Sequence, residues 1–152
     1  MFKTIMIALA SILGLAFYGL ALYSVYQLGF DPDLWRGFPS IGAGFALLLV
    51  WVFGGLGSLM LVAASIASGS RLYRVFVALL GFAGLGLALA SVLHLSIVEK
   101  IIAVKVEIVP GPGGRPVLEE RLDLGRLAEF LVMAGWPFAL LLVPAAIMVL
   151  RE

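Results

Sequence analysis

Apolar residues are concentrated in four long blocks, at positions 5–28, 41–67, 72–98 and 127–150. Each block exceeds the length of about 18 consecutive apolar residues that indicates a membrane-spanning helix. At 1.5 Å per residue, the first block would be about 36 Å long, which exceeds a hydrocarbon core of about 30 Å and predicts a tilted helix. It is also longer than the core of a signal peptide, which covers about 7–15 residues. The pattern therefore predicts an all-α integral membrane protein whose residues 1–152 form a single domain, a bundle of four transmembrane helices.

The segment at 99–125, between the third and fourth blocks, differs from the rest because it carries about half of the chain's ionisable residues. Apolar and polar residues alternate at 104–109, which is typical of a strand with one covered face. The proline- and glycine-rich stretch at 110–114 must turn, and 117–122 can return as a second strand. We therefore predict a small extramembrane β-hairpin between the third and fourth helices.

Short signals mark the ends of the predicted helices. Gly69 suits the left-handed position that ends a helix, and Ser70 can accept a backbone N–H at the start of the next one. Asp123 is an equivalent N-cap for the last helix. Pro137 and Pro144 lie inside that helix and are expected to kink it, because proline has no backbone N–H to donate.

Composition supports a lipid environment and excludes several functions. The chain is 63% hydrophobic and 12% charged, with a mean hydropathy of +1.17, whereas soluble domains carry roughly 25% charged residues. The net charge is +1 and the basic residues are scattered, so the basic patch of a nucleic-acid-binding protein is missing. The chain has no cysteine, which excludes disulfides, thiolate metal sites and iron–sulfur clusters.

An even number of helices places both termini and the turn at 68–71 on one side of the membrane. That side carries Lys3, Arg71, Arg74 and Arg151, whereas the other side carries Arg36, Lys100, Lys105, Arg115, Arg121 and Arg126. The raw count opposes cytoplasmic termini, but the positive-inside rule weighs mainly the basic residues that border short loops, and the 68–71 turn is the shortest. We therefore predict a multi-pass protein with its N- and C-termini in the cytoplasm.

The candidate cofactor-binding residue is His94, the only histidine, about one turn inside the end of the third block. Ionisable groups in membranes are candidates for function, and an imidazole can bind haem or a quinone. We favour the alternative, a neutral imidazole hydrogen-bonded to a nearby backbone carbonyl, because one histidine supplies only one of two haem ligands. The sequence accordingly predicts no cofactor, with haem or quinone as the alternative.

Catalytic motifs and intramembrane charges are missing. Glu129 is the only acid close to a block interior, and in the first turn of the last helix it can pair with Arg126. Proton-coupled carriers and pumps generally need an acid or base inside the membrane. The chain has no G-x-S-x-G sequence, and its glycine-rich turn lacks the Lys-Ser/Thr of a phosphate loop. We therefore predict no catalytic residue and no metal site.

Small residues are clustered on the second and third helices, where they allow backbones to approach closely. The candidate contact residues are Gly54, Gly57, Ser58, Gly84 and Ala88, and they serve either packing within the bundle or contact with another subunit.

Three functions remain open from the sequence. The leading hypothesis is a non-catalytic accessory or structural subunit of a larger membrane complex. The first alternative is a homo-oligomeric channel or carrier for a small solute, lined by serines such as Ser11, Ser24, Ser58, Ser65 and Ser91. The second is a redox subunit that uses His94. The expected partners are the lipid bilayer and either other membrane subunits or further copies of the chain, but not nucleic acid.

Overall fold

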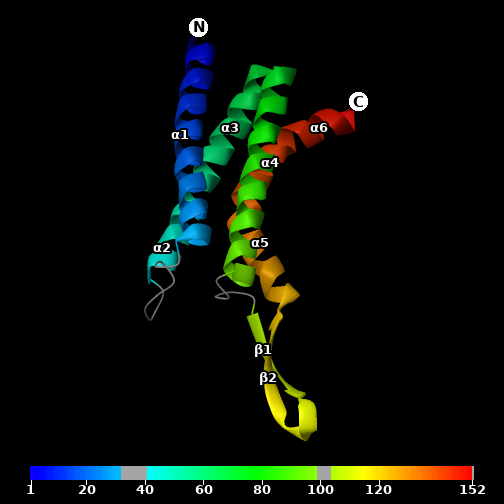
Figure 1. The fold of residues 1–152 in the computed structure, drawn as a ribbon. Coiled ribbons are helices and arrows are strands. Elements are labelled where there is room, and N and C mark those ends of the chain that lie inside the picture. Colours follow the sequence, from blue (N-terminus) through cyan, green and yellow to red (C-terminus); the bar gives the residue numbers. More distant parts are fainter. Residues whose placement is uncertain (32–40, 99–103, 152) are drawn as a thin grey trace.

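The computed structural model describes residues 1–31, 41–98 and 104–151. Within these ranges, four helical segments are long and apolar enough to cross a membrane, as the sequence predicts: Phe2–Phe30, Gly42–Ser68, Arg71–Val98 and Leu124–Arg151. The segments lie side by side, and a two-stranded hairpin extends beyond one end of them (Figure 1). Both termini lie at the opposite end (Figure 1).

The first segment is a single helix, α1 (Phe2–Phe30), whereas each of the others changes its helical pitch along its length. The second comprises α2 (Ile41–Leu49), the π-helical turn η2 (Val50–Gly54) and α3 (Gly55–Ser68). The third comprises α4 (Arg71–Leu93) and a second π-helical turn, η3 (His94–Val98). The fourth comprises α5 (Leu124–Ala139), the 3₁₀ turn η5 (Leu140–Leu142) and α6 (Val143–Arg151).

The predicted helix ends are confirmed. Gly69 follows α3 with a left-handed backbone, at φ 66°, and the Ser70 hydroxyl accepts a hydrogen bond from the backbone N–H of Tyr73 at 3.3 Å. Asp123 caps α5, because its carboxylate accepts the backbone N–H groups of Gly125 and Arg126 at 3.1 and 3.3 Å. These short-range contacts satisfy backbone groups that a helix end otherwise leaves unpaired.

The two prolines interrupt the last segment as expected, and α6 bends away from the other helices (Figure 1). Because Pro137 has no N–H, the carbonyl of Met133 loses the donor that it would have within a regular helix. The indole Nε1–H of Trp51, in η2, donates to this carbonyl at 2.8 Å. A side chain from the second segment therefore pairs the carbonyl that the proline leaves free.

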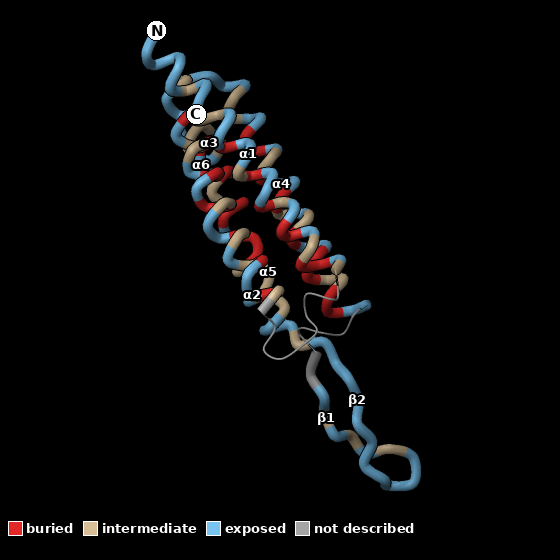
Figure 2. The backbone as a smooth tube through the Cα atoms, turned by 90° about the vertical axis from the view of Figure 1, so that its left-hand side faces the viewer, coloured by how far each residue is buried: buried red, intermediate tan, exposed pale blue. Residues whose placement is uncertain are grey.

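The core lies between the inward faces of the helices, where buried residues gather (Figure 2). Tyr18 of α1 meets Phe138 of α5 edge-on, with ring centroids 5.6 Å apart, and its hydroxyl donates to the backbone carbonyl of Leu80 in α4. Gly84 leaves room for both rings, because a Cβ there would lie 2.6 Å from Phe138 and 2.7 Å from the Tyr18 hydroxyl. Three helices thus meet at one glycine.

The predicted hairpin is confirmed within the described residues. β1 (Val104–Pro110) pairs antiparallel with β2 (Pro116–Leu122), with Ile108 opposite Leu118. The turn between them contains Pro112–Gly114, and Gly113 and Gly114 adopt positive φ angles of 78° and 77°, a region that favours glycine. The part of the prediction that concerns 99–103 lies outside the described residues.

Candidate functional site

His94 lies at the hairpin end of the bundle, where it joins α4 to the last turn of α1. Its Nδ1 lies 2.6 Å from the backbone carbonyl oxygen of Gly29, and its ring lies 4.6 Å from that of Phe30, tilted by 36°. Since a carbonyl oxygen only accepts, Nδ1 carries the proton, and in the neutral ring Nε2 is left as an acceptor. This is the hydrogen bond to a backbone carbonyl that we expect if His94 has a structural role. Binding of haem or quinone by His94 stays the untested alternative.

A second contact holds the same two helices together one turn deeper. The buried hydroxyl of Ser91 donates to the backbone carbonyl of Val25 at 3.1 Å. Gly29 permits this close approach, because a Cβ at that position would overlap both the side chain and the backbone of Ser91. Ser91 and His94 therefore fix the crossing of α1 and α4 at the end nearest the hairpin.

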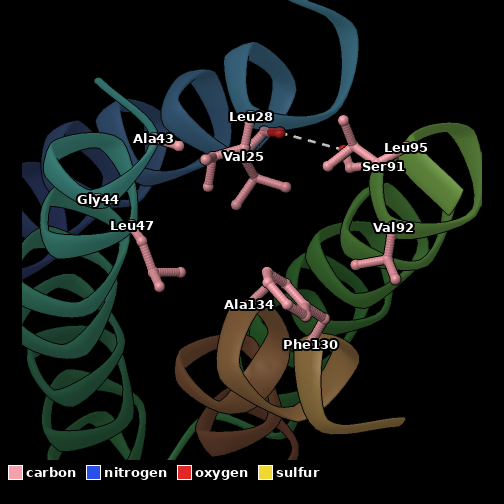
Figure 3. Close-up of a pocket in the computed structure, with 10 residues that line it drawn as sticks. All are labelled: Val25, Leu28, Ala43, Gly44, Leu47, Ser91, Val92, Leu95, Phe130 and Ala134. Carbon is pink, nitrogen blue, oxygen red and sulfur yellow. Dashed lines mark hydrogen bonds between the residues drawn. The ribbon is translucent and has the colours of Figure 1, made fainter. Parts of the chain in front are cut away.

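An apolar cavity of about 150 Å³ lies beside this crossing, surrounded by α1, α2, α4 and α5 (Figure 3). We call it the hairpin-end cavity. Its described lining consists of Val25, Leu28, Ala43, Gly44, Leu47, Ser91, Val92, Leu95, Phe130 and Ala134. Ser91 is the only one of these side chains with a polar group, and its hydroxyl is already paired with α1. This cavity is not predictable from the sequence, because its lining residues are ordinary components of apolar blocks.

The predicted small contact residues are all buried against helices of the same chain. A Cβ on Gly57 would lie 2.9 Å from the Gly14 carbonyl oxygen and from the Tyr18 backbone nitrogen, so α1 and α3 are in backbone contact there. Gly54 faces Pro137, with 3.0 Å between its hypothetical Cβ and that of the proline. Ser58 and Ala88 have no exposed surface. As placed, these residues pack the bundle internally, and any contact with another subunit must use other surfaces.

Four of the five serines proposed to line a solute pathway form hydrogen bonds with the helix backbone. Each of Ser11, Ser24, Ser65 and Ser91 donates its hydroxyl to a backbone carbonyl. Ser58 has a buried hydroxyl oxygen without a hydrogen-bond partner in the described structure. Among them only Ser91 lines the hairpin-end cavity.

The described ionisable residues form no cluster suited to metal binding. No group of three or more His, Asp or Glu residues gathers in the parts of the chain that the structure describes. The expected ion pair between Glu129 and Arg126 is not among the ion pairs seen between described residues. The backbone N–H of Arg126 donates to the carboxylate of Asp123, which caps α5.

The hairpin has one apolar and one charged face, because side chains alternate across a strand. Val106, Ile108, Leu118 and Leu122 share the apolar hairpin face with Glu120. Ile108 and Leu118, which lie directly opposite each other, are 73% and 70% exposed. Their exposure shows that no described part of the chain covers this face.

The charged face is held by ion pairs within the hairpin. Glu107 and Glu119 lie directly opposite each other, which by itself is repulsive. Arg121 offsets this repulsion, with its guanidinium nitrogens 3.5 Å from a Glu107 oxygen and 3.1 Å from a Glu119 oxygen. The charged groups of Arg121, Glu107 and Glu119 therefore find partners within the hairpin, whereas Ile108 and Leu118 on the apolar face stay exposed.

Comparison of the chain with protein-family models, with curated proteins and with solved structures found no match. We therefore infer its function from the exposed apolar face of the hairpin.

Proposed function

We propose that this chain is a multi-pass integral membrane protein that acts as a non-catalytic accessory subunit, attached to a larger membrane complex through the apolar hairpin face. The observation that carries the proposal is the exposure of Ile108 and Leu118 on a hairpin that projects beyond the helices (Figure 1).

A two-stranded hairpin is at best marginally stable alone in water, and three strands or a packed apolar face are needed for independent stability. The described hairpin has neither, because its two strands form the whole sheet within the described residues and its apolar side chains are open. Lipid cannot cover the outer part of this face, since the hairpin extends away from the helices along the direction of the bundle (Figure 1). A protein surface outside the bilayer is the remaining cover.

The partner surface that fits is apolar at its centre. Charged groups flank the apolar hairpin face on the reverse side of the ribbon, where Arg121 pairs with Glu107 and Glu119. The apolar face itself carries one described charged residue, Glu120, opposite Val106, and apolar centres with few charged groups are typical of protein interfaces. With cytoplasmic termini, the hairpin and its partner surface lie on the extracytoplasmic side.

Two adjacent residues on opposite faces provide a matched test. Leu118→Glu places a charge on the apolar hairpin face, whereas Val117→Glu places one on the charged face of the same strand. The tagged full-length chain and both variants would be purified from their native membrane in mild detergent, and their native masses and subunit compositions compared. We expect a complex with larger membrane subunits that survives in Val117→Glu and dissociates in Leu118→Glu.

Two results would contradict the proposal. If both variants keep the same complex, the apolar hairpin face is not the attachment surface. If the wild-type chain has the mass of a homo-oligomer and no other subunit, the channel or carrier alternative replaces the accessory role.

A further inference from the structure

The hairpin-end cavity has a lining that suits hydrocarbon and not water. Its one polar side chain, Ser91, has already donated its hydroxyl to Val25. A buried water needs about two to four polar partners, and apolar cavities of about 150 Å³ stay dry and bind small hydrocarbons. The described lining offers no such set of partners, so an apolar occupant is favoured.

Side-chain hydrogen bonds join the helical segments around the cavity into two pairs. Ser91 and His94 tie α4 to α1, and Trp51 ties η2, directly after α2, to α5. The hydrogen bond between Ser91 and Val25 borders the cavity (Figure 3). No hydrophobic force closes such a gap in a bilayer, because lipid tails are as apolar as the side chains.

Gly44 lies at the exposed edge of the cavity, on α2. A Cβ built at this lining residue would meet no atom within 4 Å. Because Gly44 is exposed although it lines the cavity, the cavity is open toward the membrane on this side, and an acyl chain has room to enter beside Gly44.

A cationic residue, Arg126, lies near the start of α5, the helix that contributes two lining residues. Phe130 and Ala134 of α5 line the cavity, and Arg126 lies one helical turn before Phe130, on the side of the hairpin. Residues four apart share a helix face. Arg126 is exposed and forms no ion pair with any residue in the described ranges. A guanidinium at the membrane surface attracts an anionic headgroup.

We propose that the hairpin-end cavity binds one phospholipid, with an acyl chain between α1, α2, α4 and α5 and the phosphate at Arg126. The lipid completes the bundle at the end from which the hairpin projects. This inference depends on the membrane location in the proposed function but not on a protein partner.

The test uses the full-length chain reconstituted with phosphatidylglycerol and then extracted in mild detergent, with native mass spectrometry to count bound lipid. Gly44→Phe places a ring at the open edge of the cavity, and Gly86→Phe is its control, because both glycines are exposed with no atom within 4 Å of a Cβ but only Gly44 is in the described lining. We expect one retained lipid per wild-type chain, a loss of retention of about tenfold in Gly44→Phe and no loss in Gly86→Phe. Equal retention in the two variants would overturn the proposal.

A second pair of variants tests the headgroup and needs no change in the core. Arg126→Gln should lower retention by about fivefold, as expected for one cation near an anionic surface. Arg115→Gln, in the exposed hairpin turn, should have no effect. Retention of a long-tailed ubiquinone in place of phosphatidylglycerol would overturn the phospholipid assignment. Leu118→Glu should keep the lipid, so a failed attachment of the hairpin is distinguishable from a failed lipid site.

Discussion

The hydrogen bond between Trp51 and Met133 allows a quantitative test of how the bundle compensates for a proline. Pro137 leaves the Met133 carbonyl without its helical donor, and the Trp51 indole donates to it at 2.8 Å. Trp51→Phe removes this donor while it keeps an aromatic ring at the position. In hydrocarbon no water replaces the lost partner, so the carbonyl remains unpaired.

The expected magnitude follows from measured hydrogen bonds between membrane helices, which contribute about 0.6 kcal/mol on average and up to about 1.7 kcal/mol. Trp51→Phe should therefore lower the free energy of unfolding by about 1–2 kcal/mol, including the smaller ring. In a Pro137→Ala background, the new N–H at position 137 can donate to the Met133 carbonyl within α5. The same Trp51→Phe change should then cost about 1 kcal/mol less.

The assay is reversible unfolding of the wild type, both single variants and the double variant in mixed micelles, followed by circular dichroism. Trp136→Phe is a control for the loss of an indole, because Trp136 is 39% exposed, compared with 38% for Trp51. Its indole N–H has no hydrogen-bond acceptor among the described residues. A coupling energy between Trp51 and Pro137 below about 0.3 kcal/mol would be ordinary additivity and would refute the reasoning.

Three further predictions address packing, His94 and orientation. Gly57→Leu should push α1 and α3 apart and lower the free energy of unfolding by about 1–3 kcal/mol without changing the oligomeric state of the folded protein, whereas Gly86→Leu should be tolerated; thermal melts and blue-native gels would show both. His94→Ala should leave the visible spectrum of the purified protein unchanged and cost about 1–2 kcal/mol, and loss of a haem band would contradict this. In the cysteine-free chain, a membrane-impermeant maleimide applied to intact cells should label Arg115→Cys and not Lys3→Cys, and the reverse pattern would show that the termini are outside.

Features that depend on neighbouring residues in the chain are predicted correctly from the sequence. The four apolar blocks become helices, and Gly69, Ser70 and Asp123 act at helix ends as expected. The two strands of the hairpin and the turn between them also follow from the local alternation and from the proline- and glycine-rich stretch at 110–114. Each of these features is determined within a few residues, so one sequence suffices.

Features that depend on how two helices cross are not predicted. The sequence shows that Pro137 frees a carbonyl, but it does not show that the donor is Trp51, more than 80 positions away. The π-helical turns η2 and η3 are equally hidden, since their sequences are apolar or helix-compatible. The hairpin-end cavity results from the spacing of four helices, and no pattern of apolar residues encodes an unfilled volume.

The small residues of the helices are already used for packing within the bundle. Contact between membrane helices depends on small residues that let backbones approach, and in this chain Gly57 and Gly84 already serve α1 and α5. Side chains on the outer surface of the helices, such as Phe82 and Leu79, are large and exposed, which suits contact with lipid. The surface least suited to its surroundings is instead the apolar hairpin face, because it lies beyond the helices and no described residue covers it. Substitutions on the hairpin therefore discriminate between an accessory subunit and an isolated bundle better than substitutions on the helices do.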